Sequence, residues 1–262
     1  MFDGFQNTPL LWNGNTIWEL QQFYTEHTAI SFIQKQTNKK LRLGKWVEEF
    51  VGFQLRQQSN IKIIEENLQI KNNKLTIGEL DMLLLKNEQP IHLEIIFKFY
   101  LYDPALNSYN NIENWIGPNR NDALVYKLKK LKENQLPLLY NKSTLSYLEN
   151  HNLDLKTIEQ RVCFKAQLFL PYTSQDINTE PLNKDCVMGF YISFGDISIF
   201  KNLQFYIPNK LNWLTIPHNN IEWLDYKHAV SEIEEFINIK RSPLIWLKYN
   251  DTLFKKCFIT WW

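Results

Sequence analysis

The sequence predicts an α/β protein. Three observations point to this class: a helix-spaced segment at residues 41–58, a run of strands over residues 61–102, and a second helix-spaced segment from Asn121 to about Gln135. Apolar residues make up 44% of the 262 residues, which is enough for a sizeable core. A chain of this length forms one large domain or a domain with an appendage.

The first 40 residues are predicted to form an N-terminal helical lead. Thr16 and Glu19 have the spacing of a capping box, and Phe23, His27 and Ile30 then recur at helical spacing. We expect His27 to be a packed or solvated helix residue and not a metal ligand.

The segment 41–58 has the apolar stripe of an amphipathic helix. This stripe consists of Leu43, Trp46, Val47, Phe50, Val51 and Leu55. Glu48 and Glu49 both fall within the helix, and spacing alone does not select one of them for a site. For Glu48 the plain alternative is a solvated helix glutamate.

The strands of residues 61–102 lead to a hairpin that carries charged residues. Short strands are expected at 61–65, 68–70 and 75–77, with a tight turn at Asn72-Asn73. Two longer strands, 78–85 and 91–100, are then joined by a polar turn. We interpret these two strands as the functional centre of the chain.

Ionisable residues interrupt both of these apolar strands. Because strand side chains alternate, Glu79 and Asp81 share one face, and His92, Glu94 and Lys98 share another. Buried charges are normally paired or bound to metal. Carboxylates suit Mg²⁺ or Mn²⁺, and a nearby lysine can orient the attacking water or hold a phosphate. The pattern indicates metal-assisted phosphodiester hydrolysis, and the alternative is an ordinary hairpin with Glu94 and Lys98 paired at a sheet edge.

These residues resemble the core of the PD-(D/E)XK nuclease-like superfamily, which has the restriction-endonuclease-like fold. More closely, they resemble an uncharacterised family placed in that superfamily. Its four motifs are a Leu-Gly-x-x-x-Glu helix, a Gly-Glu-Leu-Asp strand, a Glu-x-x-x-Lys-Phe-Tyr strand and a Trp-x-Gly-Pro-Asn-Arg segment. The matching segments here are 43–48, 78–81, 94–100 and 115–120.

The resemblance implies an organisation in three parts. The nuclease-like core, a central mixed sheet flanked by helices, is expected at residues 41–136. An α+β extension that packs on the core, or completes its sheet, is expected at 137–262.

The resemblance also implies the roles of individual residues. Asp81 and Glu94 would bind Mg²⁺ or Mn²⁺, Glu48 would complete the metal site, and Lys98 would be the motif lysine. The superfamily spacing is (D/E)-x-K, but Ile96 occupies that lysine position here. Along a strand, Glu94 and Lys98 are therefore roughly 13 Å apart instead of about 7 Å. This displacement supports a second hypothesis, a catalytically inactive nuclease-fold protein that acts as a nucleic-acid-binding or protein-interaction scaffold.

Contacts to nucleic acid are expected from local patches, because a net charge of +1 gives no global basic field. Arg120, in the Gly-Pro-Asn-Arg segment, and Lys127 are predicted to bind phosphates. For Lys129, Lys130 and Lys132 we favour a solvated helix face. The sequence does not distinguish DNA from RNA and gives no oligomeric state.

The remaining composition excludes several classes of protein. Three well-separated cysteines form no zinc motif and fit a reducing cytoplasm. The N-terminus does not resemble a signal peptide, and no run of 18 apolar residues predicts a membrane span. No nucleophile elbow, P-loop, Rossmann or HExxH motif occurs.

The second half of the chain carries weaker signals. Helices are expected at 143–150 and 226–239, and strands at 161–172, 186–194, 203–207, 244–249 and 254–262. We expect the terminal Trp261-Trp262 pair to serve in packing and not in base stacking.

Overall fold

The computed structural model describes residues 1–14, 17–32 and 41–262. Within these ranges the strands are β1 (Ile61–Asn72), β2 (Leu75–Lys86), β3 (Gln89–Tyr102), β4 (Trp115–Ile116), β5 (Glu159–Pro171), β6 (Val187–Ser193), β7 (Gln204–Tyr206), β8 (Leu244–Lys248) and β9 (Phe254–Thr260). The α-helices are α1 (Phe2–Gln6), α2 (Leu43–Arg56), α3 (Leu124–Lys130), α4 (Lys142–Asn150) and α5 (Tyr226–Asn238).

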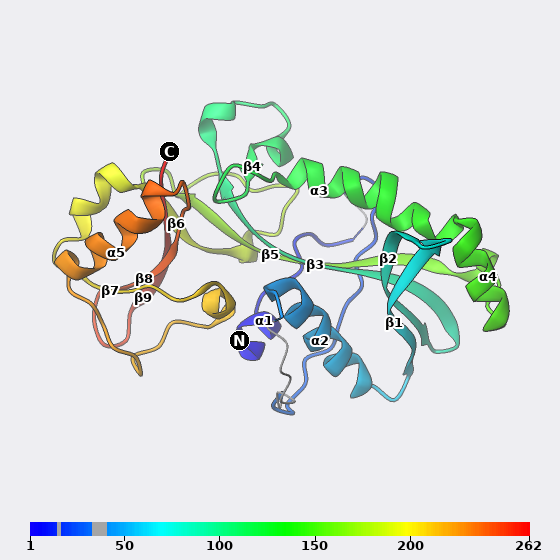
Figure 1. Ribbon diagram of the computed structural model, residues 1–262. Coiled ribbons are helices and arrows are strands. Elements are labelled where there is room, and N and C mark those ends of the chain that lie inside the picture. The colour runs from blue at the N-terminus through cyan, green and yellow to red at the C-terminus, as the bar shows by residue number, and fades with distance from the viewer. Residues whose placement is uncertain (15–16, 33–40) are drawn as a thin grey trace. The chain divides into compact units, whose positions relative to one another are not determined.

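The strands pair in the order β1-β2-β3-β5-β6-β9-β8-β7, with β4 paired to β3. Parallel and antiparallel pairs both occur, and helices flank the strands (Figure 1). This arrangement confirms the predicted fold class, an α/β protein with a central mixed sheet flanked by helices.

The chain divides into two compact units. One, here called the hairpin unit, consists of residues 10–97 and 126–165. The other, here called the C-terminal unit, consists of residues 1–9, 98–125 and 166–262. Each unit is discontinuous in sequence. The domain boundaries predicted at residues 40 and 136 remain a prediction.

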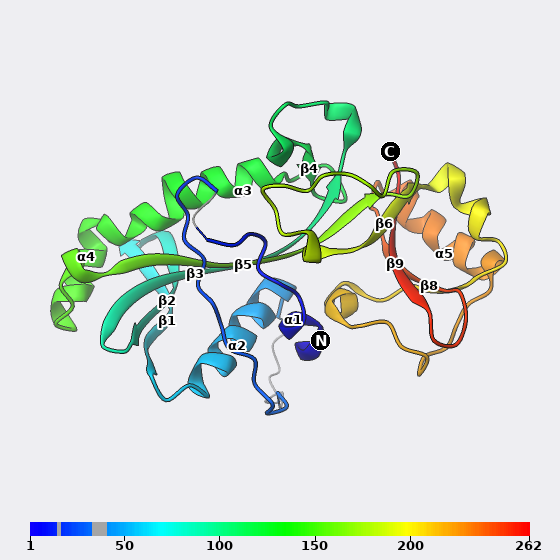
Figure 2. The ribbon, with the colours of Figure 1, turned by 180° about the vertical axis from the view of Figure 1, so that it is seen from behind.

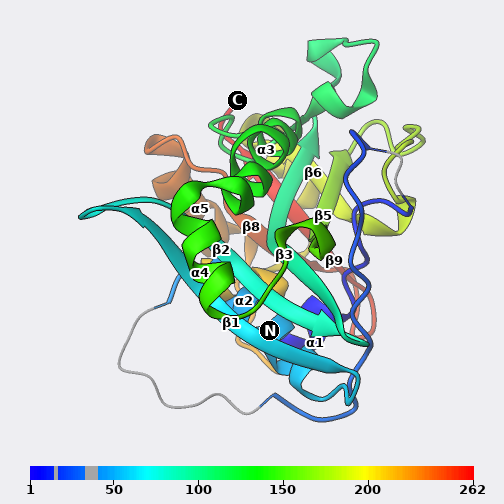
Figure 3. The same cartoon turned by 90° about the vertical axis from the view of Figure 1, so that its right-hand side faces the viewer.

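The hairpin unit is built on the long antiparallel pair β1–β2, which is seen in Figure 3. The short strands expected at 61–65 and 68–70 are one continuous strand, irregular between Ile63 and Glu65 and between Ile70 and Lys71. The turn from β2 to β3 is shorter than expected, because only Asn87 and Glu88 separate the strands. Both have positive φ, as a type I′ hairpin turn requires.

Helices cover both faces of the hairpin unit's strands. Figures 1 and 3 show α2 on one face and α4 on the other. The predicted stripe of α2 is confirmed, since Trp46, Val47, Phe50, Val51 and Leu55 are buried. On the opposite face, strand residues pack against the helical segment of residues 136–150, and this core includes Leu80, Leu83, Leu139 and Leu148.

The helix predicted from Thr16 is wrong for residues 17–32, where no helix forms. Thr16 itself lies outside the described residues. Gln22 forms an isolated bridge with Val162 of β5, and the Phe23 amide donates to the Val162 carbonyl at 2.8 Å. Hydrogen bonding to a strand therefore overrides the helical spacing of this segment. Within residues 1–14 and 17–32, the α-helix that forms is the short α1.

The helix predicted after these strands also differs from the expectation. Residues expected as one helix from Asn121 to about Gln135 form α3, which is followed by the π-helical segment η3 (Leu131–Gln135) and the 3₁₀ segment η4 (Leu136–Tyr140). A π-helical turn contains one residue more than an α-helical turn would. It changes the direction in which Gln135 projects.

The C-terminal unit contains β6, β7, β8 and β9, with α5 packed beside them (Figure 2). Its core includes Phe190, Phe205, Ile233, Ile245 and Ile259. The strands and the helix predicted for residues 186–262 are confirmed to within a few residues at each end. Among the helices of the described residues, none has the length and apolar character needed to span a membrane.

Candidate functional site

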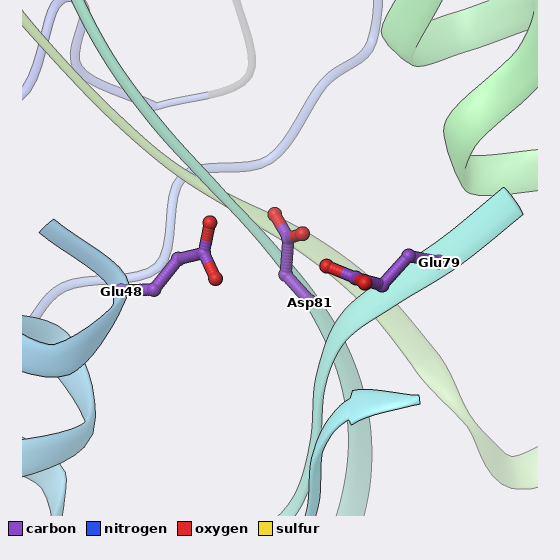
Figure 4. Close-up of side chains that lie close together, drawn as sticks. All are labelled: Glu48, Glu79 and Asp81. Atoms are coloured by element: carbon purple, nitrogen blue, oxygen red, sulfur yellow. The ribbon is translucent and has the colours of Figure 1, made fainter. Parts of the chain in front are cut away.

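Three carboxylates converge in the hairpin unit. Glu48 projects from α2, and Glu79 and Asp81 project from β2. One oxygen of each lies within 4.8 Å of an oxygen of the others, and Figure 4 shows the three groups facing one another. Glu79 and Asp81 share a strand face, as predicted from alternation. The convergence brings together two predicted metal ligands, Glu48 and Asp81, and adds Glu79.

A lysine lies against this acidic cluster. Lys45 Nζ donates to Glu48 Oε2 at 2.7 Å, to Glu79 Oε1 at 2.5 Å and to Asn67 Oδ1 at 2.7 Å. Burial alone would lower the pKa of Lys45, but its bonds to the two glutamates raise that pKa overall. The ammonium occupies part of the space to which the acidic oxygens point.

One ammonium does not neutralise the cluster. Burial raises the pKa of Glu48, and repulsion from Glu79 and Glu94 adds to the effect, so that together they outweigh the attraction of Lys45. The pKa of Asp81 is raised to about 8, first by burial and then by the charge of Glu94. The Ile95 amide, which donates to Asp81 Oδ2 at 2.8 Å, acts in the opposite direction. The acids of the cluster therefore resist ionising together, and a cation at this place would stabilise their charged forms.

Glu94 has different surroundings. Its side chain is completely buried. Gln135 Nε2 donates to Glu94 Oε2 at 2.5 Å, and His92 Nε2 lies 3.1 Å from Glu94 Oε1. The Asp81 amide lies 3.5 Å from the same Oε1 atom, so Glu94 is adjacent to the cluster although its oxygens are held by other partners.

The hydrogen bonds determine the tautomer of His92. Gln160 Nε2 donates to the Leu136 carbonyl at 2.6 Å, which fixes the orientation of its amide because a carbonyl only accepts. The same Nε2 lies 3.1 Å from His92 Nδ1, so this ring nitrogen accepts. The proton on Nε2 is then directed at Glu94.

The π-helical segment η3 links this network to a lysine. Gln135, its last residue, accepts from Lys127 Nζ at 2.6 Å through Oε1 while its Nε2 binds Glu94. The charge of Lys127 also lowers the pKa of Asp81. Lys127, predicted as a phosphate contact, thus acts on the acidic site within the hairpin unit.

Two other predicted residues lie in the C-terminal unit with partners of their own. Lys98 Nζ donates to Asp122 Oδ2 at 2.5 Å, with about a third of each side chain exposed. Arg120 forms an ion pair with the buried carboxylate of Asp103, and its guanidinium lies 4.2 Å from the ring centroid of Trp262. Arg120 also has a positive φ, which is uncommon for a residue other than glycine. The Gly-Pro-Asn-Arg segment is therefore tied into its own unit.

Sequence reasoning left Glu79, Lys45 and Gln135 out of the site. Glu79 carried a signal, since it is two residues before Asp81 on the same strand face. Lys45 carried a weaker one, because it precedes Glu48 by three residues and can reach it along the helix. Gln135 carried none, because its contact with Glu94 spans 41 residues of sequence.

The donor set of the cluster fits a hard divalent cation. Mg²⁺ and Mn²⁺ bind carboxylate oxygens, and Mg²⁺ commonly uses one or two carboxylates together with waters. Asp81 and Glu48 could fill this role, with Glu79 as the third ligand, although Lys45 is bonded to both glutamates. Glu94 accepts from the Asp81 backbone amide. It does not belong to the converging group found among the described residues.

Comparison with known proteins places the chain in a family. A family model described as "Domain of unknown function (DUF1853)" matches residues 17–253. No curated protein and no solved structure matches the chain.

Proposed function

Because the chain belongs to this family, DUF1853, whose description states no activity, we propose its function from the site itself: a Mg²⁺- or Mn²⁺-dependent phosphodiester hydrolase that acts on nucleic acid. The observation that carries the proposal is the convergence of Glu48, Glu79 and Asp81 beside a buried glutamate. The resemblance of residues 78–100 to the core of the PD-(D/E)XK nuclease-like superfamily supports the same activity.

The acidic residues have distinct parts in this proposal. Asp81 and Glu48 hold the cation, and Glu79 joins them once Lys45 has moved aside. When bound, the cation polarises the phosphate and promotes ionisation of the attacking water. Glu94, held by His92 and Gln135, orients Asp81 through the backbone amides of the β2–β3 pair.

A lysine is needed to stabilise the charge that develops on the phosphate. We assign this part to Lys127, because its charge acts on Asp81 within the hairpin unit. Lys98 was predicted for the part, and its ammonium binds Asp122. Substituting each lysine by methionine tests the assignment: Lys127→Met should lower kcat about a hundredfold, whereas Lys98→Met should lower it less than tenfold. The reverse order would restore Lys98 as the motif lysine.

A second function, a non-catalytic scaffold on the same fold, is favoured by one observation. Lys45 already bridges Glu48 and Glu79, as an ammonium does in a purely structural ion-pair network. In this case divalent cations would not bind. Nucleic acid, if bound, would be held without cleavage, and its affinity would fall with increasing salt.

Calorimetric titration of Mg²⁺ and Mn²⁺ distinguishes the two functions. Wild type should bind a divalent cation, and Asp81→Asn should lose that binding while Glu49→Gln, an exposed neighbour on α2, should keep it. The titration should be repeated with a short oligonucleotide, since Mg²⁺ sites often include a substrate phosphate. Absence of binding under both conditions would leave the scaffold as the function.

Hydrolysis itself is tested on DNA and RNA oligonucleotides. Asp81→Ala should abolish cleavage and leave the circular dichroism spectrum unchanged. Cleavage that persists in this variant would contradict the assignment of the metal site. Arg120→Ala should weaken binding to all sequences by a similar factor if Arg120 contacts a phosphate.

The cellular compartment in which the protein acts is also part of the proposal. The three cysteines Cys163, Cys186 and Cys257 are buried and form no disulfide bond. Free thiols are usual in reducing surroundings, so we propose that the protein acts in the cytoplasm.

A further inference from the structure

The C-terminal unit contains a cavity of about 130 Å³. It is bounded by α1, by the 3₁₀ segment η8 (Lys210–Leu214) with the residues after it, and by strands β5, β6 and β9. Part of its wall is apolar, formed by Leu214, Ile216 and Phe254, and part is polar, formed by Asn7, Gln167 and Lys256. A cavity with an apolar wall and one cationic group suits a small amphiphilic molecule.

Lys256 is the charged side chain of this wall. It lies on β9 and is only 6% exposed. Its Nζ donates to Gln167 Oε1 at 3.0 Å and to the Trp213 carbonyl at 2.6 Å. Both acceptors are neutral amide oxygens, so two of the three N–H groups of the ammonium are bonded and no negative charge is supplied.

The lysine lacks a counter-ion in the part of the chain that the structure describes. None of the ion pairs among residues 1–14, 17–32 and 41–262 includes Lys256. Burial accordingly lowers the pKa of Lys256 to about 7. A buried ammonium with a spare N–H group beside a cavity is stabilised by an anion that enters the cavity.

A short chain of hydrogen bonds holds Gln167, the hydrogen-bond partner of Lys256, in place. Gln167 Nε2 donates to Thr8 Oγ1 at 3.2 Å, and the Thr8 hydroxyl donates to the Gly4 carbonyl at 2.8 Å. Since the Thr8 hydroxyl has one proton, Gln167 must offer its amide nitrogen to Thr8 and its oxygen to Lys256. The polar wall is thus preorganised, and the third N–H group of Lys256 remains for a ligand.

We propose that this cavity binds a small carboxylate, with the carboxylate group on Lys256 Nζ and a short hydrocarbon chain against Leu214, Ile216 and Phe254. The volume limits the ligand to about six non-hydrogen atoms, because an apolar cavity of about 150 Å³ holds one benzene molecule. A carboxylate supplies the missing negative charge and accepts from the third N–H group. This site is separate from the acidic cluster and does not depend on the function proposed for that cluster.

Butyrate and butyramide provide a matched pair of probes, since they have the same size and differ in charge. We expect calorimetry near pH 7 to show binding of butyrate to the full chain, and binding of butyramide at least tenfold weaker. Lys256→Met should weaken butyrate binding at least tenfold, whereas Lys255→Met, an exposed neighbour on β9, should leave it within twofold. Equal binding of the two probes, or unchanged binding in Lys256→Met, would overturn the proposal.

A second variant keeps the test decisive if Lys256→Met does not fold. Ile216, half exposed at the wall, can be replaced by tryptophan to fill the cavity while Lys256 is retained. Ile216→Trp should fold and lose butyrate binding. Butyrate binding that survives in Ile216→Trp, or no binding of millimolar butyrate to wild type, would overturn the proposal.

Discussion

Asp81 and Glu94 lie on neighbouring strands of the hairpin unit, yet their carboxylates have opposite surroundings. Both oxygens of Glu94 face donors, supplied by His92 and Gln135. Asp81 receives one backbone amide and lies beside the carboxylates of Glu48, Glu79 and Glu94. Because burial is common to both acids and hydrogen-bond donors are not, this difference is the reason we propose Asp81, and not Glu94, as a ligand of the cation.

Removal of the Glu94 carboxylate should have the largest effect on stability. Glu94→Ala leaves the His92 Nε2–H and the Gln135 amide without an acceptor inside the unit, which should lower the free energy of unfolding by about 3 kcal/mol. Urea denaturation measures the loss, and Glu149→Ala on the exposed side of α4 should change stability by less than about 0.5 kcal/mol. A loss for Glu94→Ala as small as that of the control would show that the network does not stabilise the fold.

The Asp81 environment predicts an unusual dependence of stability on pH. Its pKa is about 8 in the folded protein and 3.8 ordinarily, so between these values the folded chain holds a proton that the unfolded chain has released. Stability should therefore decrease as pH rises from 5 to 7. Lys256, with a folded pKa near 7, contributes in the opposite direction only above that pH.

Unfolding by urea at several pH values from 5 to 7 tests this prediction. Asp81→Asn should flatten the decrease seen in wild type, and Glu49→Gln should not. An identical slope in wild type and Asp81→Asn would mean that Asp81 ionises normally.

The acidic cluster should become a better cation site when its internal ammonium is removed. Lys45→Met frees the oxygens of Glu48 and Glu79 and removes a competing positive charge, so Mg²⁺ affinity should rise about fivefold. Calorimetric titration against Lys62→Met, an exposed lysine on β1, supplies the comparison. Weaker binding in Lys45→Met would indicate that the lysine organises the ligands.

The smallest effect is expected at Lys98. Its pair with Asp122 is partly exposed on both sides, and such pairs typically contribute less than about 1 kcal/mol. Lys98→Met should accordingly change the free energy of unfolding by less than that amount, in denaturation measurements at moderate salt. A loss comparable to that of Glu94→Ala would show that Lys98 has a structural role.

Much of the fold could be predicted because local patterns agree with the final packing. The apolar stripe of α2, the alternation along β2 and the strands near the C-terminus are all local signals. The lead could not be predicted, because residues 17–32 have helical spacing but hydrogen bond to β5 at Val162, which is distant in sequence. The spacing of apolar residues indicates which side chains are buried. It does not indicate whether the backbone will hydrogen bond within a helix or to a distant strand.

The candidate site likewise contains residues that local patterns predict and residues that they do not. Glu48 and Asp81 could be proposed from a motif, and Glu79 follows from strand alternation. Gln135 and Gln160 could not be proposed, because each reaches its partner across a large sequence separation. Gln135 in particular lies in a polar helical segment, where an amide is an ordinary surface residue. The helix that carries Gln135 was also expected to be regular, and the π-helical segment places this residue differently.

The π-helical segment η3 has a consequence for the length of the chain. An α-helix advances each residue by about 100°, so one residue more or fewer turns every later side chain by that angle. Gln135, at the end of η3, keeps its place over Glu94 only while the extra residue is present. A single-residue deletion of Lys132, Glu133 or Asn134 would convert the segment to an α-helix and would separate Gln135 from Lys127 and Glu94, although all three of those residues would remain. In this part of the chain the number of residues is therefore as strongly constrained as their identity.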